Sequence, residues 1–252
     1  MDEKNERHEG HEFKINPPVS KKLENFWYYY KWHTGVAAFV ILVSTILLFQ
    51  TCSKVEPDAY ILYAGTHDIQ RVGQNGDVSE YEGALSSLNR ICNDYDGDGI
   101  INISLLDLFV VNGDEADALL ESNPGAEINS ALVKEDADTL HQKLLFGEYY
   151  LCFLSERLFK EYEERYEGAI FVKIAPYTKE GAEYEYASEC GIYLRSLPFA
   201  NLPEIEKLPD DTVVCLRQLS DISTKLGASD NEEHFARGEE MLKKLLSYGL
   251  SK

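Results

Sequence analysis

Acidic residues at alternate positions make the segment DYDGDGIIN, residues 94–102, the part of the chain best suited to chemistry. A calcium loop of the EF-hand kind carries oxygen ligands at positions one, three, five, seven, nine and twelve. Asp94, Asp96 and Asp98 occupy the first three of these positions, and Asn102 occupies the ninth. The spacing therefore predicts a candidate calcium site made of oxygen ligands.

The same loop departs from a calcium site in two respects. The twelfth position, where a carboxylate should supply two oxygens, is Leu105, and Asp107 lies two places further on. The loop also leads into the β-branched, apolar segment 100–111, which favours a strand instead of the helix of an EF-hand. The alternative is a sharp turn, which Asp and Gly residues favour. If calcium binds, we expect a weak Kd of about 10⁻⁴–10⁻³ M.

No other motif predicts chemistry. His67 and Asp68 follow an expected strand, where α/β domains often bind ligands, but such a pair is also common in loops. The chain shows neither the pattern of a nucleophile elbow nor a glycine-rich phosphate loop. The sequence therefore favours a protein that is not an enzyme, and it predicts no cofactor apart from weakly bound calcium.

The charge balance narrows the range of partners. The chain of 252 residues has 44 acidic and 24 basic residues, a formal net charge of −20. This charge excludes nucleic acid as a partner and disfavours a face lying on anionic lipid. It is compatible with a cation or a basic partner.

The five cysteines are far apart and include no C-x-x-C pair, which argues against zinc. Cys92, Cys152 and Cys215 lie in apolar runs and are expected to be small buried residues. The odd number leaves the redox state of the cysteines open.

The N-terminal part contains an expected membrane anchor. Residues 34–52 include the uncharged run TGVAAFVILVSTILLF, close to the ~20 residues that cross a bilayer. The aromatic segment FWYYYKWH precedes it, as is typical of a membrane interface. Lys21, Lys22 and Lys31 lie before the run and only Lys54 after it, so the positive-inside rule places the N-terminus in the cytoplasm.

The same residues have three alternative interpretations: a cleaved signal peptide, a segment before a lipid-modified Cys52, and a buried core helix. The leader is long and is acidic as well as basic, which disfavours a signal peptide, and the bulky residues before Cys52 disfavour lipid modification. The flanking aromatic residues and lysines disfavour a buried core helix. We predict a cytoplasmic tail and interface segment (residues 1–33), a transmembrane helix (34–52) and an extracytoplasmic domain (53–252).

Strand-like and helix-like segments alternate through the outer domain. Strands are expected at 58–65, 100–111, 148–155, 169–174, 190–196 and 212–219, and helices at 79–95, 127–147, 155–166 and 231–248. This alternation predicts an α/β fold with a mixed, mostly parallel sheet and flanking helices.

The segment INSALVKEDADTLHQKLLFGEYYLCFLSERLFKEYEE, followed later by the helix FARGEEMLKKLL, resembles part of a two-lobed extracellular solute-binding protein. YYYKWH, KVEPDAYILY and the DGDG turn make the whole chain similar to small, uncharacterised membrane-anchored proteins of Gram-positive bacteria. The resemblance implies an extracytoplasmic domain that binds a small molecule or a protein. The alternative is an accessory or structural subunit of a cell-envelope complex.

Overall fold

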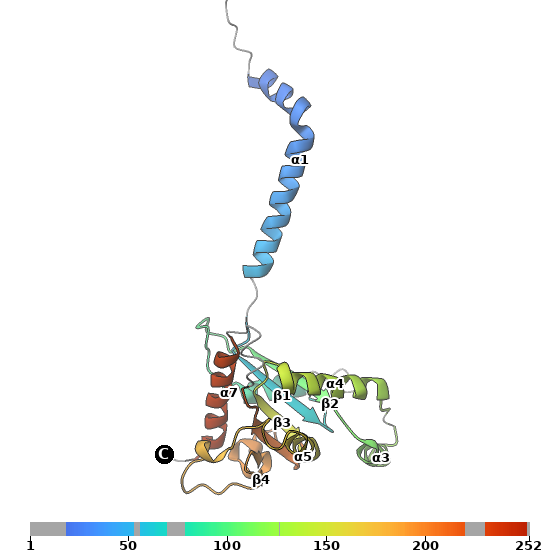
Figure 1. Cartoon of the computed structure of the whole chain (residues 1–252), viewed down its shortest axis with the longest axis vertical. Helices are drawn as coiled ribbons and strands as arrows, with labels where there is room; N and C mark the ends of the chain where they lie inside the picture. The colour runs from blue at the N-terminus through green and yellow to red at the C-terminus, as the bar shows by residue number, and fades with distance from the viewer. Residues whose placement is uncertain (1–18, 53–55, 70–78, 126, 220–229, 251–252) are drawn as a thin grey trace, which may run out of the picture. The chain divides into compact units, whose positions relative to one another are not determined.

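The computed structural model describes residues 19–52, 56–69, 79–125, 127–219 and 230–250. The chain divides into two compact units, residues 1–55 and 56–252 (Figure 1). In the part described, the first unit is the helix α1 and the second is an α/β domain.

The helix α1, Val19–Cys52, is continuous over 34 residues. It contains the aromatic segment, the expected membrane segment and residues 19–22 of the expected tail, whose residues 1–18 lie outside the described part. Its span Phe26–Leu48 has 23 residues, is apolar and is not buried in the protein. At 1.5 Å per residue this span is about 35 Å long, which exceeds the ~30 Å of a bilayer core. The helix is thus long and apolar enough to cross a membrane.

The α/β domain is built on a six-stranded sheet with the strand order β2-β1-β3-β6-β5-β4. The strand β1 lies between β2 and β3 and is parallel to both. Ala59 of β1 lies opposite Ile103 of β2, and Ile61 lies opposite Leu151 of β3. The strands are β1 (Ala59–Gly65), β2 (Ile103–Phe109), β3 (Leu151–Ser155), β4 (Tyr186–Ser188), β5 (Gly191–Tyr193) and β6 (Thr212–Leu216).

The prediction of a mixed sheet is confirmed, but the prediction that it is mostly parallel is wrong. The pairings β3–β6, β6–β5 and β5–β4 are all antiparallel. Parallel neighbours need a long crossover connection, usually a helix. A short turn joins β4 to β5, and only 3₁₀ turns and loops lie between β5 and β6. The second half of the sheet therefore runs antiparallel.

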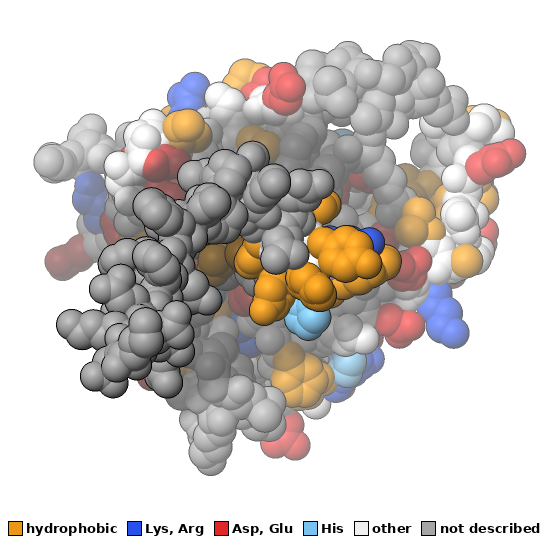
Figure 2. All heavy atoms as spheres, turned by 90° about the horizontal axis from the view of Figure 1, so that it is seen from above, with side chains coloured by type: hydrophobic (Ala, Val, Ile, Leu, Met, Phe, Trp, Pro, Cys, Tyr) orange, Lys and Arg blue, Asp and Glu red, His pale blue; other side chains and the backbone are white. Residues whose placement is uncertain are grey.

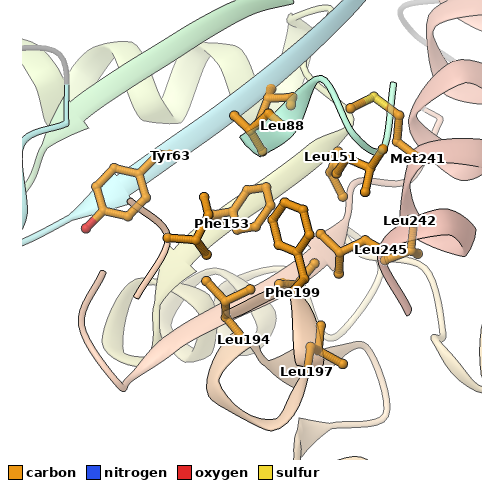
Figure 3. Packing of buried hydrophobic residues seen from close by; sticks show 14 of the residues in the cluster. Tyr63, Leu88, Leu151, Phe153, Leu194, Leu197, Phe199, Met241, Leu242 and Leu245 are labelled. Atoms are coloured by element: carbon orange, nitrogen blue, oxygen red, sulfur yellow. The ribbon is translucent and has the colours of Figure 1, made fainter. Parts of the chain in front are cut away.

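Helices cover both faces of the sheet. On one face, Leu88 of α2 and Met241 of α7 belong to the same buried cluster as Tyr63 of β1 and Phe153 of β3 (Figure 3). On the other face, α4 and α5 pack on Leu62 of β1. The helices of the domain that the structure describes are α2 (Ser79–Leu88), α3 (Gly113–Ser122), α4 (Ser130–Phe146), α5 (Glu156–Arg165) and α7 (Asp230–Ser247).

Burial on both faces explains why the central strands have uninterrupted apolar sequences. Every residue of β3 and of β6 is buried, as expected where helices cover both sides of a sheet. Cys152 and Cys215 lie opposite each other in these strands, and both are buried with free thiols. Cys92 and Cys190 are also buried and free, so the expectation of small buried residues is confirmed for the three cysteines named.

Apart from shifted ends, three elements differ from the sequence expectation, and one of them is the short strand β4, where no strand is expected. Residues 169–174 are not a strand: Phe171 makes one isolated bridge to Arg217, and Glu167 and Gly168 before it form a turn with positive φ. The helix α3 was not expected. It begins with a capping box in which Asn112 and Glu115 accept each other's backbone N–H groups at 2.8 and 2.9 Å.

Arg217, directly after β6, is a buried charge that fixes the end of α4 to the sheet. Its side chain is 1% exposed. The guanidinium donates to the carbonyl oxygens of Leu144 at 3.4 Å, Tyr149 at 3.1 Å and Gly147. It also lies 4.1 Å from the centre of the Tyr150 ring. Burial lowers the pKa of Arg217. The arginine thus satisfies carbonyl groups at a helix end, where intrahelical partners are missing.

Candidate functional site

The aspartate loop before β2 is held by its own side chains. Asp94 accepts the backbone N–H groups of Gly97 at 2.7 Å and Gly99 at 2.8 Å. Asp96 accepts the N–H of Asp98 at 3.0 Å, and Asp98 accepts that of Ile100 at 2.7 Å. Gly97 and Gly99 have φ values of +75° and +86°, which glycine adopts at little cost. These hydrogen bonds account for the shape of the turn without a metal ion.

A carboxylate from another segment, Asp58, lies beside this loop. Asp58 precedes β1 and is 1% exposed. Its two oxygens accept the N–H groups of Tyr95 at 2.7 Å and Asn102 at 2.8 Å. Carboxylate oxygens of Asp58, Asp94 and Asp96 all lie within 4.8 Å of one another. The buried Asp58 thus joins the start of β1 to the loop that precedes the parallel strand β2.

Two of the four predicted calcium ligands, Asp94 and Asp96, belong to this group of three carboxylates. Asp98 lies outside the group and accepts the N–H of Ile100. Asn102 is exposed and contributes its backbone N–H to Asp58. The sequence analysis missed Asp58. Its position before the first strand is the signal that could have found it, because parallel neighbouring strands begin at the same edge of a sheet, and the aspartate loop precedes the second strand. Calcium binding stays a prediction for this group.

The two exposed carboxylates of the group have opposite pKa shifts. The N–H groups of Gly99 and Gly97 lower the pKa of Asp94. For Asp96, the N–H of Asp98 lowers the pKa, but desolvation and the negative charges of Asp98 and Asp58 outweigh it, so the pKa is raised. Repulsion between neighbouring carboxylates is the kind of strain that a bound cation relieves.

Side chains of α7 contact the aspartate loop and the residues next to it. Tyr95 donates to Glu240 at 2.9 Å, and Asn93 donates to the same carboxylate at 2.6 Å. Arg237 lies 4.8 Å from the centre of the Tyr95 ring and donates to the backbone oxygen of Asp58 at 3.1 Å. The loop is therefore part of the packed domain.

A pocket of about 630 Å³ lies at the opposite, carboxyl edge of the parallel strands. We call it the carboxyl-edge pocket. It is formed by the segment after β1, the end of β2, the C-terminal end of α3 and the N-terminal end of α4. Its described lining residues are Thr66, Asp68, Phe109, Leu119, Ser122, Asn123, Glu127, Ile128, Asn129 and Leu132.

The strand order explains why this edge can hold a ligand. The chain leaves β1 for β2 on one side and later returns to β3 on the other side of β1. Open α/β sheets bind ligands outside the carboxyl ends of their strands, where the strand order reverses. Asp68, whose position after the first strand is compatible with either a ligand site or an ordinary loop, lines the pocket. Its neighbour His67 donates its backbone N–H to the Tyr63 hydroxyl at 3.3 Å.

The part of the domain that follows α5 offers a less suitable ligand site. A second pocket, of about 460 Å³, includes Tyr186, Lys173 and Glu189, but the lysine and the glutamate pair with each other at 2.6 Å. On the different face seen in Figure 2, acidic side chains lie between hydrophobic and basic ones.

Comparison with known proteins gives no further guide to the site. No protein-family model, curated protein or solved structure matches the chain. The resemblance to solute-binding proteins therefore stays a prediction.

Proposed function

We propose that this chain is a single-pass membrane protein whose α/β domain lies outside the cytoplasm and binds a small molecule or a protein partner without catalysis. The observation that carries the proposal is the carboxyl-edge pocket. Its volume of about 630 Å³ falls within the roughly 300–1,000 Å³ typical of ligand sites. It combines an apolar wall with several polar groups, which is the usual composition of such sites.

The membrane part of the proposal is supported by α1. Its aromatic side chains, among them Trp27 and Trp32, are exposed, and they precede an apolar run. Such rings favour the membrane interface because they combine an apolar body with a polar tip. The excess of lysines before the run supports a cytoplasmic N-terminus.

The distribution of charge supports an extracytoplasmic domain with a cationic or basic partner. Residues 1–55 contain seven of the 24 basic residues and six of the 44 acidic residues. This leaves 17 and 38 in residues 56–252, a formal net charge of −21 for the α/β domain. A domain of this charge attracts cations and is repelled by anionic lipid headgroups.

A solute panel with a pocket-filling variant tests the proposal. Ser122, the last residue of α3, is exposed and lines the pocket. Ser122→Trp should fill the pocket without disturbing the core. We expect a solute that raises the Tm of the full-length chain in detergent to lose this effect in the variant.

Ser247→Trp is a matched control. Ser247 is exposed and ends α7, and its hydroxyl donates to the carbonyl three residues earlier, as that of Ser122 does. The control should keep the solute effect. A panel without any effect, together with a fixed partner that co-purifies from detergent, would favour the alternative of an accessory or structural subunit of an envelope complex.

A further inference from the structure

The strand β2 lies at one edge of the sheet, because β1 is the strand that it pairs with among the described residues. Its last neighbour, Val110, donates its N–H to Gly65 of β1 at 3.0 Å. Backbone groups of successive strand residues point to opposite sides, so residues of odd number in β2 direct theirs away from β1. Phe109 confirms this direction, since its N–H donates to Asp136 of α4 at 3.0 Å.

Ile103 and Leu105 direct their backbone groups to the same outer side as Phe109. Within the described part of the chain, their N–H and C=O groups form no hydrogen bond on this side. We call these groups the outer edge of β2. The side chains of both residues are buried, at 7% and 6% exposure, so the core holds the strand in its extended form. Such a row of backbone groups is a template for a further strand.

The strand β2 lacks the features that usually protect an edge strand. Protected edges are short, bulged, or contain lysine or proline. The seven residues of β2, ISLLDLF, include no lysine or proline and keep a continuous register with β1. At the other edge of the sheet, β4 has three residues and a register shift between Tyr186 and Ser188. The β2 edge is therefore the one suited to strand addition.

The charges around β2 determine which kind of segment can pair with it. Residues 91–133, which include β2, contain no lysine or arginine and nine acidic residues. The nine are Asp94, Asp96, Asp98, Asp107, Asp114, Glu115, Asp117, Glu121 and Glu127. A second copy of β2 would bring the same acidic residues and be repelled. A segment that contains lysine or arginine would be attracted.

We propose that the outer edge of β2 binds an extended segment of a partner protein that contains lysine or arginine, which adds a seventh strand to the sheet. The backbone of this segment bonds to Ile103 and Leu105, and its basic side chains lie near the acidic residues before and after β2. The proposal goes beyond the small-molecule site, because neither Ile103 nor Leu105 lines the carboxyl-edge pocket.

Peptide probes test the proposal. Acetyl-KVKVKVK-amide is about 23 Å long when extended, as is β2. Its neutral and acidic counterparts replace lysine by threonine or glutamate. Calorimetry on the full-length chain in nanodiscs of zwitterionic lipid, with empty nanodiscs as the blank, measures binding. We expect the lysine peptide to bind roughly five- to tenfold more tightly than the threonine peptide, and the glutamate peptide to bind most weakly.

A further peptide separates strand pairing from simple charge attraction. N-methyl groups on two neighbouring central residues of the lysine peptide remove one donor from each of its edges and leave its charge unchanged. This peptide should bind roughly tenfold more weakly, because ladder hydrogen bonds are lost and groups of β2 are left unpaired. Equal binding of both peptides would overturn the proposal, since charge alone would then account for the affinity.

Photo-cross-linking locates the bound peptide. A photoreactive leucine replaces the central valine, and mass spectrometry maps the attachment sites. We expect them within residues 100–109. Attachment at β4, Tyr186–Ser188, would overturn the proposal. The variant Ser122→Trp, which fills the carboxyl-edge pocket, should leave peptide binding unchanged, so a failure of this proposal and a failure of the small-molecule site give different results.

Two double variants test the local charges at physiological ionic strength, where charges further away than about 8 Å are screened. Asp98→Asn with Asp114→Asn removes exposed acidic groups on either side of β2 and should weaken binding of the lysine peptide roughly threefold. Glu180→Gln with Glu183→Gln removes the same charge from exposed positions before β4 and should leave the affinity unchanged. An equal loss in both would overturn the assignment to β2.

Two further results would overturn the proposal. The first is that none of the peptides binds. The second is that the chain forms a dimer in detergent that excludes the lysine peptide, because a second copy would then occupy the edge.

Discussion

Asp58 changes the ligand set that the aspartate loop offers. The sequence pattern selects Asp94, Asp96 and Asp98, but the structure replaces Asp98 by the buried Asp58, which comes from another segment. All three carboxylates of the resulting group already accept backbone N–H groups. A calcium ion would therefore use the remaining lone pairs of oxygens that the fold has already oriented.

The residue-scale prediction concerns calcium and separates these two ligand sets. At a calcium concentration about tenfold above Kd, binding should stabilise the fold by about 1.4 kcal/mol. Asp96→Asn should abolish the resulting rise in Tm, whereas Asp98→Asn should keep it. Differential scanning calorimetry of the full-length chain at millimolar calcium measures both. An unchanged Tm in the wild-type protein would remove the calcium site.

The rise in Tm that calcium causes should disappear at acidic pH. The pKa of Asp94 is lowered in the folded protein, so its contribution to stability is present above its unfolded pKa and is lost as the pH falls through the folded value. The pKa of Asp96 is raised, so Asp96 takes up its proton first as the pH falls. The calcium-dependent rise in Tm should therefore fade as Asp96 protonates, before Asp94 does.

Residue types and spacing were enough to locate the aspartate loop and to draw attention to Asp68, but not to identify the groups around them. The loop is recognisable because its acids lie close together in the sequence. Asp58 lies 36 residues before Asp94 in the numbering, and only the parallel pairing of β1 and β2 brings them together. The pocket was missed for a different reason: α3 was not expected, although its Asn112–Glu115 capping box is visible in the sequence.

At the scale of elements, the pattern of apolar residues predicted the helices and strands that form the centre of the domain. The strands β1, β2, β3 and β6 and the helices α4, α5 and α7 lie where expected, because the strands are short apolar runs and the helices have apolar residues at helical spacing. The short strand β4 and the turn at residues 169–174 depend on pairing with distant segments. No local pattern determines such pairing.

The element-scale prediction concerns the attachment of α4 to the sheet by Arg217. Arg217→Met should lower the free energy of unfolding by about 2–4 kcal/mol, because buried carbonyls of the α4 end lose their donors. The measurement is chemical denaturation followed by circular dichroism.

Arg165→Met is the matched control for this prediction. Arg165 also lies over a tyrosine ring, at 5.3 Å, but it is exposed and pairs with Glu161. An exposed ion pair contributes little, so this variant should change the free energy of unfolding by less than about 1 kcal/mol. An equal loss in both variants would show that contact with the tyrosine ring, and not the carbonyl hydrogen bonds, accounts for the effect.

At the scale of the whole molecule, the proposal depends on which side of the membrane the α/β domain occupies. Protease added to intact cells should digest residues 56–252, because the lysines before the apolar run favour a cytoplasmic N-terminus. Immunoblotting with a C-terminal tag measures the digestion. A domain that resists protease until the cells are lysed would place it on the cytoplasmic side.

The bond between the two ends of the α/β domain has a consequence for the order of folding. Arg237 donates to the backbone oxygens of Pro57 and Asp58 at 3.3 and 3.1 Å, across 180 and 179 residues of sequence. During synthesis, Pro57 and Asp58 at the start of β1 are made 180 and 179 residues before Arg237 of α7. A ribosome-bound chain that stops before α7 therefore lacks the group that donates to the start of β1, and these two hydrogen bonds form only after Arg237 has been made.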